Sequence, residues 1–123
     1  MTTDLPALGL FILRVFTGAA ILTHGIPKLL DFKGTLKWIQ HEKFPLPVLS
    51  TIGVTLAETF GALLLILGVY TIYAGAVLAF SMLVAILFHI KKHDTWKQME
   101  DAALYFVIFL VISIAGPGAW TLL

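Results

Sequence analysis

The stretch LPALGLFILRVFTGAAILTHGIPKLL, residues 5–30, decides the class of fold. A helical crossing of a bilayer needs about 20 predominantly apolar residues, and this stretch supplies them despite Arg14. Because lipid offers an exposed backbone no hydrogen-bond partner, a spanning segment is either a helix or a strand of a closed barrel. A continuous apolar run favours the helix. The run lacks a basic start and a small-residue cleavage pattern, so we expect a retained helix rather than a secretory signal.

Three further apolar blocks follow this first one. They cover residues 47–69, 72–90 and 102–116, and 59% of the whole chain is hydrophobic whereas only 12% is charged. Such a composition is typical of a protein that lies in lipid rather than in water. The sequence therefore predicts an all-α fold, a transmembrane four-helix bundle, formed by a single domain over residues 1–123.

The connections between the blocks are of different kinds. Residues 31–46 place apolar side chains at helical spacing among lysines, which predicts a short interfacial helix between the first two spans. Gly25 and Pro27 predict a bend or an end of the first helix, because proline disrupts a helix interior. Residues 67–75 form an uncharged turn between the second and third spans, and GPG at 116–118 ends the fourth.

The basic residues predict an orientation in the membrane. All seven lysines lie on the side that holds the two polar connections, and the other side has no lysine or arginine outside a span. Cytoplasmic loops carry an excess of such residues, so we expect both polar connections to face the cytoplasm and both termini to face outward. The lysines are Lys28, Lys33, Lys37, Lys43, Lys91, Lys92 and Lys97.

Ionisable residues inside the spans are the candidates for a site. A charge at mid-bilayer costs at least ~2.5–3.5 kcal/mol, so it usually faces the protein interior and a partner. Depths estimated at ~1.5 Å per residue predict an intramembrane ion pair between Arg14 and Glu58. His24 and Lys28 share one face of the first helix, and His89 in the third helix and Glu100 at the start of the fourth are expected at the same depth. These positions predict a ligand-binding cluster at the cytoplasmic end, made of His24, Lys28, His89 and Glu100.

Structural roles also account for several of these residues. The Arg14–Glu58 pair could serve only to lock two helices together. Lys28 alone could extend to the headgroups, and Glu100 could stabilise the start of the fourth helix through the helix dipole. Tyr105 lies away from the Glu100 face and is interpreted as a packing or interface aromatic.

Composition excludes several classes of function. The chain has no cysteine, which excludes disulfide exchange, thiolate catalysis and iron–sulfur ligation by its own residues. Its formal net charge of +1, without a basic cluster interleaved with aromatics, argues against a nucleic-acid partner. A metal site made of His24, His89 and Glu100 would depend on tertiary spacing that a sequence does not show, and we predict no metal.

The sequence resembles the DoxX family of small bacterial membrane proteins. The resemblance rests on LRVFTGAAILTHGIPKL at 13–29, AETFGALLLILGVYT at 57–71, AILFHIKKH at 85–93 and the closing GPG, and it runs through all four spans. It implies a four-helix multi-pass protein of the bacterial inner membrane whose polar positions are Arg14, His24, Gly25, Lys28, Glu58 and His89. The chain departs from the family at its end, where GPGAWTLL replaces a basic residue and a Ser-Leu-Asp-like tail.

Two functions of different classes follow. The resemblance implies a link to membrane redox complexes. An apolar pocket with proton donors and acceptors suits a quinone or another lipid-soluble molecule. In this hypothesis His24 and His89 hydrogen-bond the ring, Lys28 stabilises negative charge on its oxygens, and Glu100 exchanges protons with the cytoplasm. The alternative is a non-catalytic assembly module that binds a partner protein, for instance from a redox complex. Haem held by His24 and His89 is a minor third possibility.

Overall fold

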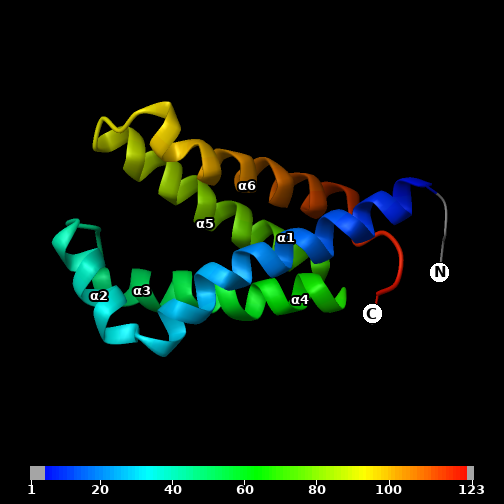
Figure 1. The fold of residues 1–123 in the computed structure, drawn as a ribbon, viewed down its shortest axis with the longest axis horizontal. Coiled ribbons are helices and arrows are strands. Elements are labelled where there is room, and N and C mark those ends of the chain that lie inside the picture. The colour runs from blue at the N-terminus through cyan, green and yellow to red at the C-terminus, as the bar shows by residue number, and fades with distance from the viewer. Residues whose placement is uncertain (1–4, 122–123) are drawn as a thin grey trace.

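The computed structural model describes residues 5–121 and contains four helices long and apolar enough to cross a membrane. No strand occurs among these residues, so the predicted all-α class is confirmed. The two ends of the described chain lie at the same end of the molecule, opposite the short helix α2 (Figure 1). The elements are α1 Leu5–Leu30, α2 Phe32–His41, α3 Pro47–Leu56, the π-helix η1 Ala57–Gly61, α4 Ala62–Leu67, α5 Thr71–Lys91 and α6 Trp96–Ala115.

The second crossing, Pro47–Leu67, is one rod made of three elements. It begins at Pro47, where proline costs no hydrogen bond, and it ends at Gly68, whose φ of 73° is easily adopted only by glycine. One π-helical turn, Ala57–Gly61, interrupts the α-helical pattern in the middle. A π turn of this kind inserts extra backbone and is frequent at functional sites.

Two helix boundaries differ from those predicted. Pro27 does not end α1, which continues for another turn to Leu30. The fourth helix begins at Trp96 rather than near residue 102, because Thr95 and Gln98 form a capping box that starts the helix within the polar segment. Hydropathy therefore underestimated the length of this helix, because its first turn is polar although its cap is well formed.

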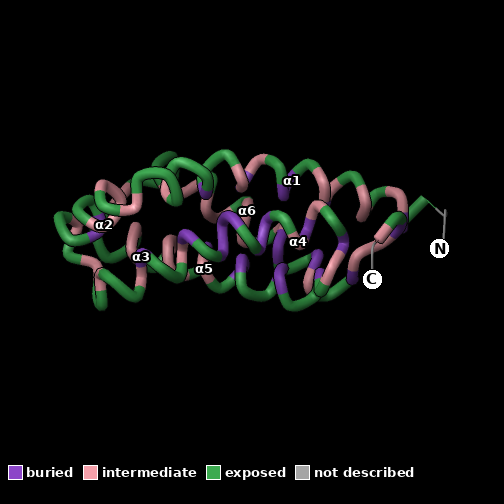
Figure 2. The backbone as a smooth tube through the Cα atoms, turned by 90° about the horizontal axis from the view of Figure 1, so that it is seen from below, coloured by how far each residue is buried: buried purple, intermediate pink, exposed green. Residues whose placement is uncertain are grey.

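Close helix approach shapes the core. A side chain added at Gly18 would meet Ile66 Cγ1 at 2.8 Å, and one at Gly75 would meet the Phe109 carbonyl at 3.1 Å. These glycines bring α1 onto α4 and α5 onto α6, as small residues commonly do in membrane bundles. Buried residues concentrate in the middle of the bundle (Figure 2), around Ile21, Leu65, Leu78, Phe109 and Ile112.

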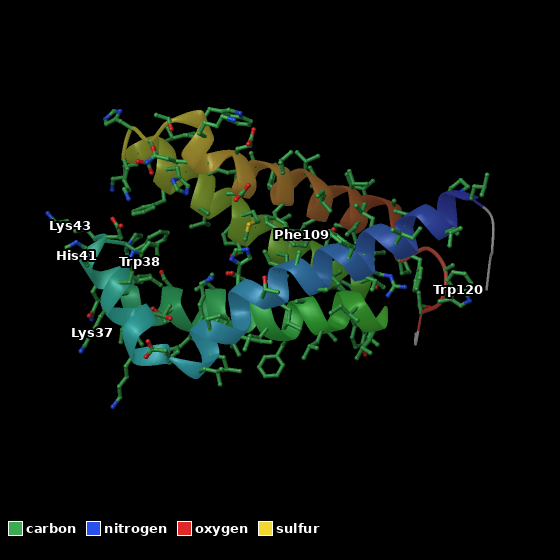
Figure 3. All side chains as sticks on the ribbon, viewed as in Figure 1. Lys37, Trp38, His41, Lys43, Phe109 and Trp120 are labelled. Carbon is green, nitrogen blue, oxygen red and sulfur yellow. The ribbon has the colours of Figure 1, made fainter. Side chains whose placement is uncertain are left out.

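Exposed aromatic side chains mark both ends of the bundle. Trp38 on α2 lies toward the end with the polar connections, whereas Trp120 lies at the opposite end (Figure 3). Trp96 is the first residue of α6, directly after the α5–α6 connection. Tyr70 and Tyr73, at the α4–α5 turn, are also exposed. Tryptophan and tyrosine favour the two membrane–water interfaces, so this arrangement agrees with a bundle that spans the bilayer.

Candidate functional site

Arg14 is completely buried and binds five backbone carbonyls. One terminal nitrogen donates to Leu65 O at 2.7 Å and to Ile66 O at 3.0 Å, near the end of α4. The other terminal nitrogen and Nε donate to the segment after α6, to Ala119 O at 2.9 Å, Trp120 O at 3.0 Å and Pro117 O at 3.1 Å. All five guanidinium donors are thereby used, and α1 is tied to α4 and to the C-terminal segment.

The predicted Arg14–Glu58 ion pair is wrong. Within residues 5–121, the guanidinium of Arg14 donates only to backbone oxygens, and Glu58 binds Lys28 instead. The error is one of depth, because Arg14 lies level with Leu65 and Ile66. Roughly 12 Å of helix separates Ile66 from Glu58, which is too far for direct contact.

Lys28 and Glu58 form the intramembrane ion pair. Lys28 Nζ donates to Glu58 Oε1 at 2.6 Å and to Oε2 at 2.9 Å, and it lies 3.3 Å from the backbone oxygen of His24. The Glu58 side chain is 4% exposed and that of Lys28 is 26% exposed. The carboxylate therefore depends on this lysine for its charge compensation.

Gly25 and the π turn bring this pair together. A side chain at Gly25 would collide with the backbone carbonyl of Glu58, and its Cβ would stand 2.9 Å from Thr59 Cγ2. Gly25 therefore lets α1 lie directly on η1. Lys28 follows three residues later on the same helix face, which places its amine at the Glu58 carboxylate. The glycine serves close approach rather than the predicted bend.

A cavity of about 520 Å³ opens beside the ion pair, between α2, the second crossing and α5. Lys28 and Glu58 reach it from one side and His89 from α5. The remaining walls are mostly apolar or aromatic, and they include Trp38, Phe80 and Phe88. A volume of this size with few polar groups is typical of a small-molecule site.

His89 is oriented by a carboxylate. Its Nδ1 lies 2.7 Å from Asp94 Oδ2, just beyond the end of α5. Because this contact occupies one ring nitrogen, Nε2 is the nitrogen left for a ligand. The sequence predicts His89 but not Asp94 as part of the site, because the role of Asp94 depends on the turn that returns the chain toward α5.

The other two predicted ligand-binding residues lie outside this cavity. His24 is exposed, and its ring contacts that of Tyr105 edge-on with centroids 6.2 Å apart, on the α6 side of α1. Glu100 makes no side-chain hydrogen bond or ion pair with any described residue. Lys28 and His89 thus share a cavity, whereas His24 and Glu100 do not join them.

The polar residues just described lie in a part of the chain that matches a known sequence family. Residues 9–90 match the DoxX family, a range that includes Arg14, Lys28, Glu58 and His89. The chain belongs to the DoxX family. The DoxX match extends from α1 to the end of α5 and stops before α6.

A curated relative extends the comparison over nearly the whole chain. The chain is 27% identical to the inner membrane protein YphA of Escherichia coli strain K12, over 92% of this chain and 86% of that protein. No solved structure matches significantly. Together with the four apolar helices, the relative supports a multi-pass inner-membrane location for this DoxX protein.

Sequence reasoning missed two further features of the site. The π turn at Ala57–Gly61 has no sequence signature in the chain, although Gly61 and the buried Glu58 fall within it. The contribution of α2 was also missed. The lysines of this helix suggested an interfacial role, whereas Trp38 and Ile39 line the cavity. The strong amphipathicity of residues 32–41 was the available signal, since an apolar face must cover something.

Among residues 5–121, no three His, Asp or Glu side chains are placed to hold a metal ion.

Proposed function

We propose that this DoxX protein is a redox-linked membrane subunit that binds a quinone, or a similar lipid-soluble ring compound, in the cavity between α2, the second crossing and α5. The observation that carries the proposal is an apolar cavity with Lys28, Glu58 and His89 on its lining. Apolar walls suit a hydrocarbon tail, whereas nitrogen donors suit the oxygens of a ring.

The residues present fit the polar demands of such a ligand. Lys28 and Glu58 present a closed ion pair to the cavity: the three lysine donors are taken by the carboxylate and by the His24 carbonyl, so the pair supplies polarity rather than net charge. His89, held by Asp94 through Nδ1, presents Nε2 as a donor or an acceptor of one proton. A bound quinone supplies the capacity to take up electrons and protons; the side chains orient the ring and move protons to and from it.

A cavity-filling substitution tests this proposal. Gly53 lines the cavity, and a Cβ added there meets nothing within 4 Å. Gly9 on α1 is equally open but lies outside the cavity. We expect Gly53→Phe to remove ligand binding while Gly9→Phe retains it, with both variants folding like the wild type.

Trp38 provides the readout, because it lines the cavity. Replacing Trp96 and Trp120 by phenylalanine leaves Trp38 as the single tryptophan reporter. Titration with a short-chain ubiquinone in detergent is expected to quench Trp38 saturably. An unsaturable response, or equal quenching in Gly53→Phe, refutes the proposal and leaves the assembly-module alternative.

We also propose that both termini face the periplasm and both polar connections the cytoplasm. The lysines at 33, 37, 43, 91, 92 and 97 gather at the end that holds α2 and the α5–α6 connection, and the positive-inside rule places that end in the cytoplasm. Because the chain has no cysteine, single cysteines can be introduced at Lys97 and at Tyr70. In intact cells an impermeant maleimide should label only the Tyr70 position; labelling at Lys97 alone reverses the orientation.

A further inference from the structure

A second cavity lies next to the first, at the end of the bundle that holds the polar connections. It has a volume of about 430 Å³ and lies between the segment that follows α2 and the last turns of α5. Its walls combine apolar side chains with charged ones from both segments. They are Glu42, Lys43, Phe44, Pro45, Val84, Leu87, Phe88, Lys91 and Lys92.

The charges of this cavity are unbalanced. Lys92 Nζ binds Glu42 Oε2 at 3.1 Å and also lies over the Phe88 ring, so these two opposite charges compensate each other. Lys43 and Lys91 have no carboxylate partner in the described part of the chain. Two positive charges thus remain at the rim of a cavity whose walls are otherwise largely apolar.

We propose that this second cavity binds an anionic phospholipid. Lys43 and Lys91 would hold the phosphate group, and one acyl chain would lie along Val84, Leu87 and Phe88. Basic pockets at the membrane surface are known to select acidic headgroups. A soluble anion would satisfy the lysines but leave the apolar wall uncovered, so a molecule with both parts fits better.

The level of the cavity in the bundle supports a lipid. Lys43 follows the end of α2 and Lys91 is the last residue of α5, where the chain leaves the apolar span. Trp38 and Trp96 are exposed toward the same end, and exposed tryptophans mark the depth of the headgroups. The proposed phosphate would thus lie at the level where phospholipid phosphates occur.

The two cavities adjoin each other and share part of their walls. The rings of Phe44 and Phe88 lie 4.4 Å apart, and both residues line both cavities. Lys43, Leu87 and Lys91 line only the second cavity, so most of the proposed lipid contacts lie outside the first. This inference does not depend on quinone binding, and either proposal can fail alone.

Native mass spectrometry of the full chain in neutral detergent tests the inference. Phosphatidylglycerol and phosphatidylcholine with identical acyl chains are titrated separately onto the wild type and onto Lys43→Gln/Lys91→Gln. Each interfacial lysine contributes roughly fivefold in affinity for an acidic lipid. We expect the wild type to bind phosphatidylglycerol at least ~10-fold more tightly than phosphatidylcholine. The double variant should bind phosphatidylglycerol roughly 25-fold more weakly than the wild type does.

A matched control removes the same charge elsewhere. Lys33 and Lys97 are exposed and line neither cavity, so Lys33→Gln/Lys97→Gln should keep the wild-type preference. An equal loss in both double variants means that net charge alone attracts the lipid, and it overturns the proposal. Equal wild-type affinity for the two lipids also overturns it. Inorganic phosphate at millimolar concentration should not displace the lipid; displacement would identify a site for free phosphate instead.

Discussion

Gly25 of α1 lies directly against the backbone carbonyl of Glu58, inside the π turn of the second crossing. This contact sets the distance between the two helices, and with it the reach of Lys28 to the Glu58 carboxylate. The glycine is needed for packing, while the proline is accommodated within α1.

Gly25→Ala should therefore destabilise the protein. The new methyl group collides with main-chain atoms, which cannot rotate away as a side chain can, so α1 must move off η1. Overpacking of this kind costs about 1–3 kcal/mol. Thermal unfolding in detergent measures the loss, with Gly9→Ala as the control because Gly9 has open space around it. Equal stability of the two variants would contradict this role of Gly25.

The two single substitutions in the Lys28–Glu58 pair should lower the stability of the protein by different amounts. Lys28→Met leaves a carboxylate that is 4% exposed without a partner, whereas Glu58→Gln leaves a lysine whose side chain is 26% exposed and can extend toward the headgroups. Breaking a buried pair costs about 3–5 kcal/mol, so we expect a loss near that range for Lys28→Met and a smaller one for Glu58→Gln.

Removing both charges separates stability from function. The combined Lys28→Met/Glu58→Gln variant should be more stable than Lys28→Met alone, because no buried charge is left unpaired. Its affinity for quinone should nevertheless be lower than that of the wild type, because both polar groups of the ion pair that lines the cavity are replaced. Guanidinium or thermal unfolding of the four proteins gives the cycle. Strictly additive losses would show that the two side chains do not interact energetically.

Arg14→Lys should release the C-terminal segment. Lysine has three donors on one nitrogen and cannot reach five carbonyls that surround a planar guanidinium. Buried carbonyls left without a partner cost about 1–3 kcal/mol each before relaxation. Because Trp120 contacts the Phe11 ring, its fluorescence in a Trp38→Phe/Trp96→Phe background should shift to the red. An unchanged emission spectrum would show that the segment is held by other contacts.

The sequence predicted the crossings well because their signal is local. Apolar length alone located all four helices, and the fold class followed from the behaviour of a backbone in lipid. The start of α6 was missed for an equally local reason, since hydropathy does not register the cap formed by Thr95 and Gln98. Periodicity is thus a good guide to the middle of a span and a weaker one to its ends.

The partners of the buried charges could be predicted only in part. Arg14 binds backbone oxygens, which every residue carries and which no sequence pattern distinguishes. The pairing of Lys28 with Glu58 depends on the relative depth of two helices, and Gly25 and the π turn set that depth. Both are tertiary features. The ionisable residues could therefore be identified from the sequence, but not their pairing.

The two histidines of the sequence-based site should now behave differently. His89 lines the first cavity, whereas the His24 ring lies against Tyr105 of α6 and does not line that cavity. His89→Phe removes both ring nitrogens and keeps an aromatic ring, so the quinone affinity should fall by roughly 2- to 12-fold, the value of one hydrogen bond. His24→Phe preserves the contact with Tyr105 and should leave that affinity unchanged. Trp38 quenching measures both variants, and a loss confined to His24→Phe would move the ligand from the first cavity to the space between α1 and α6.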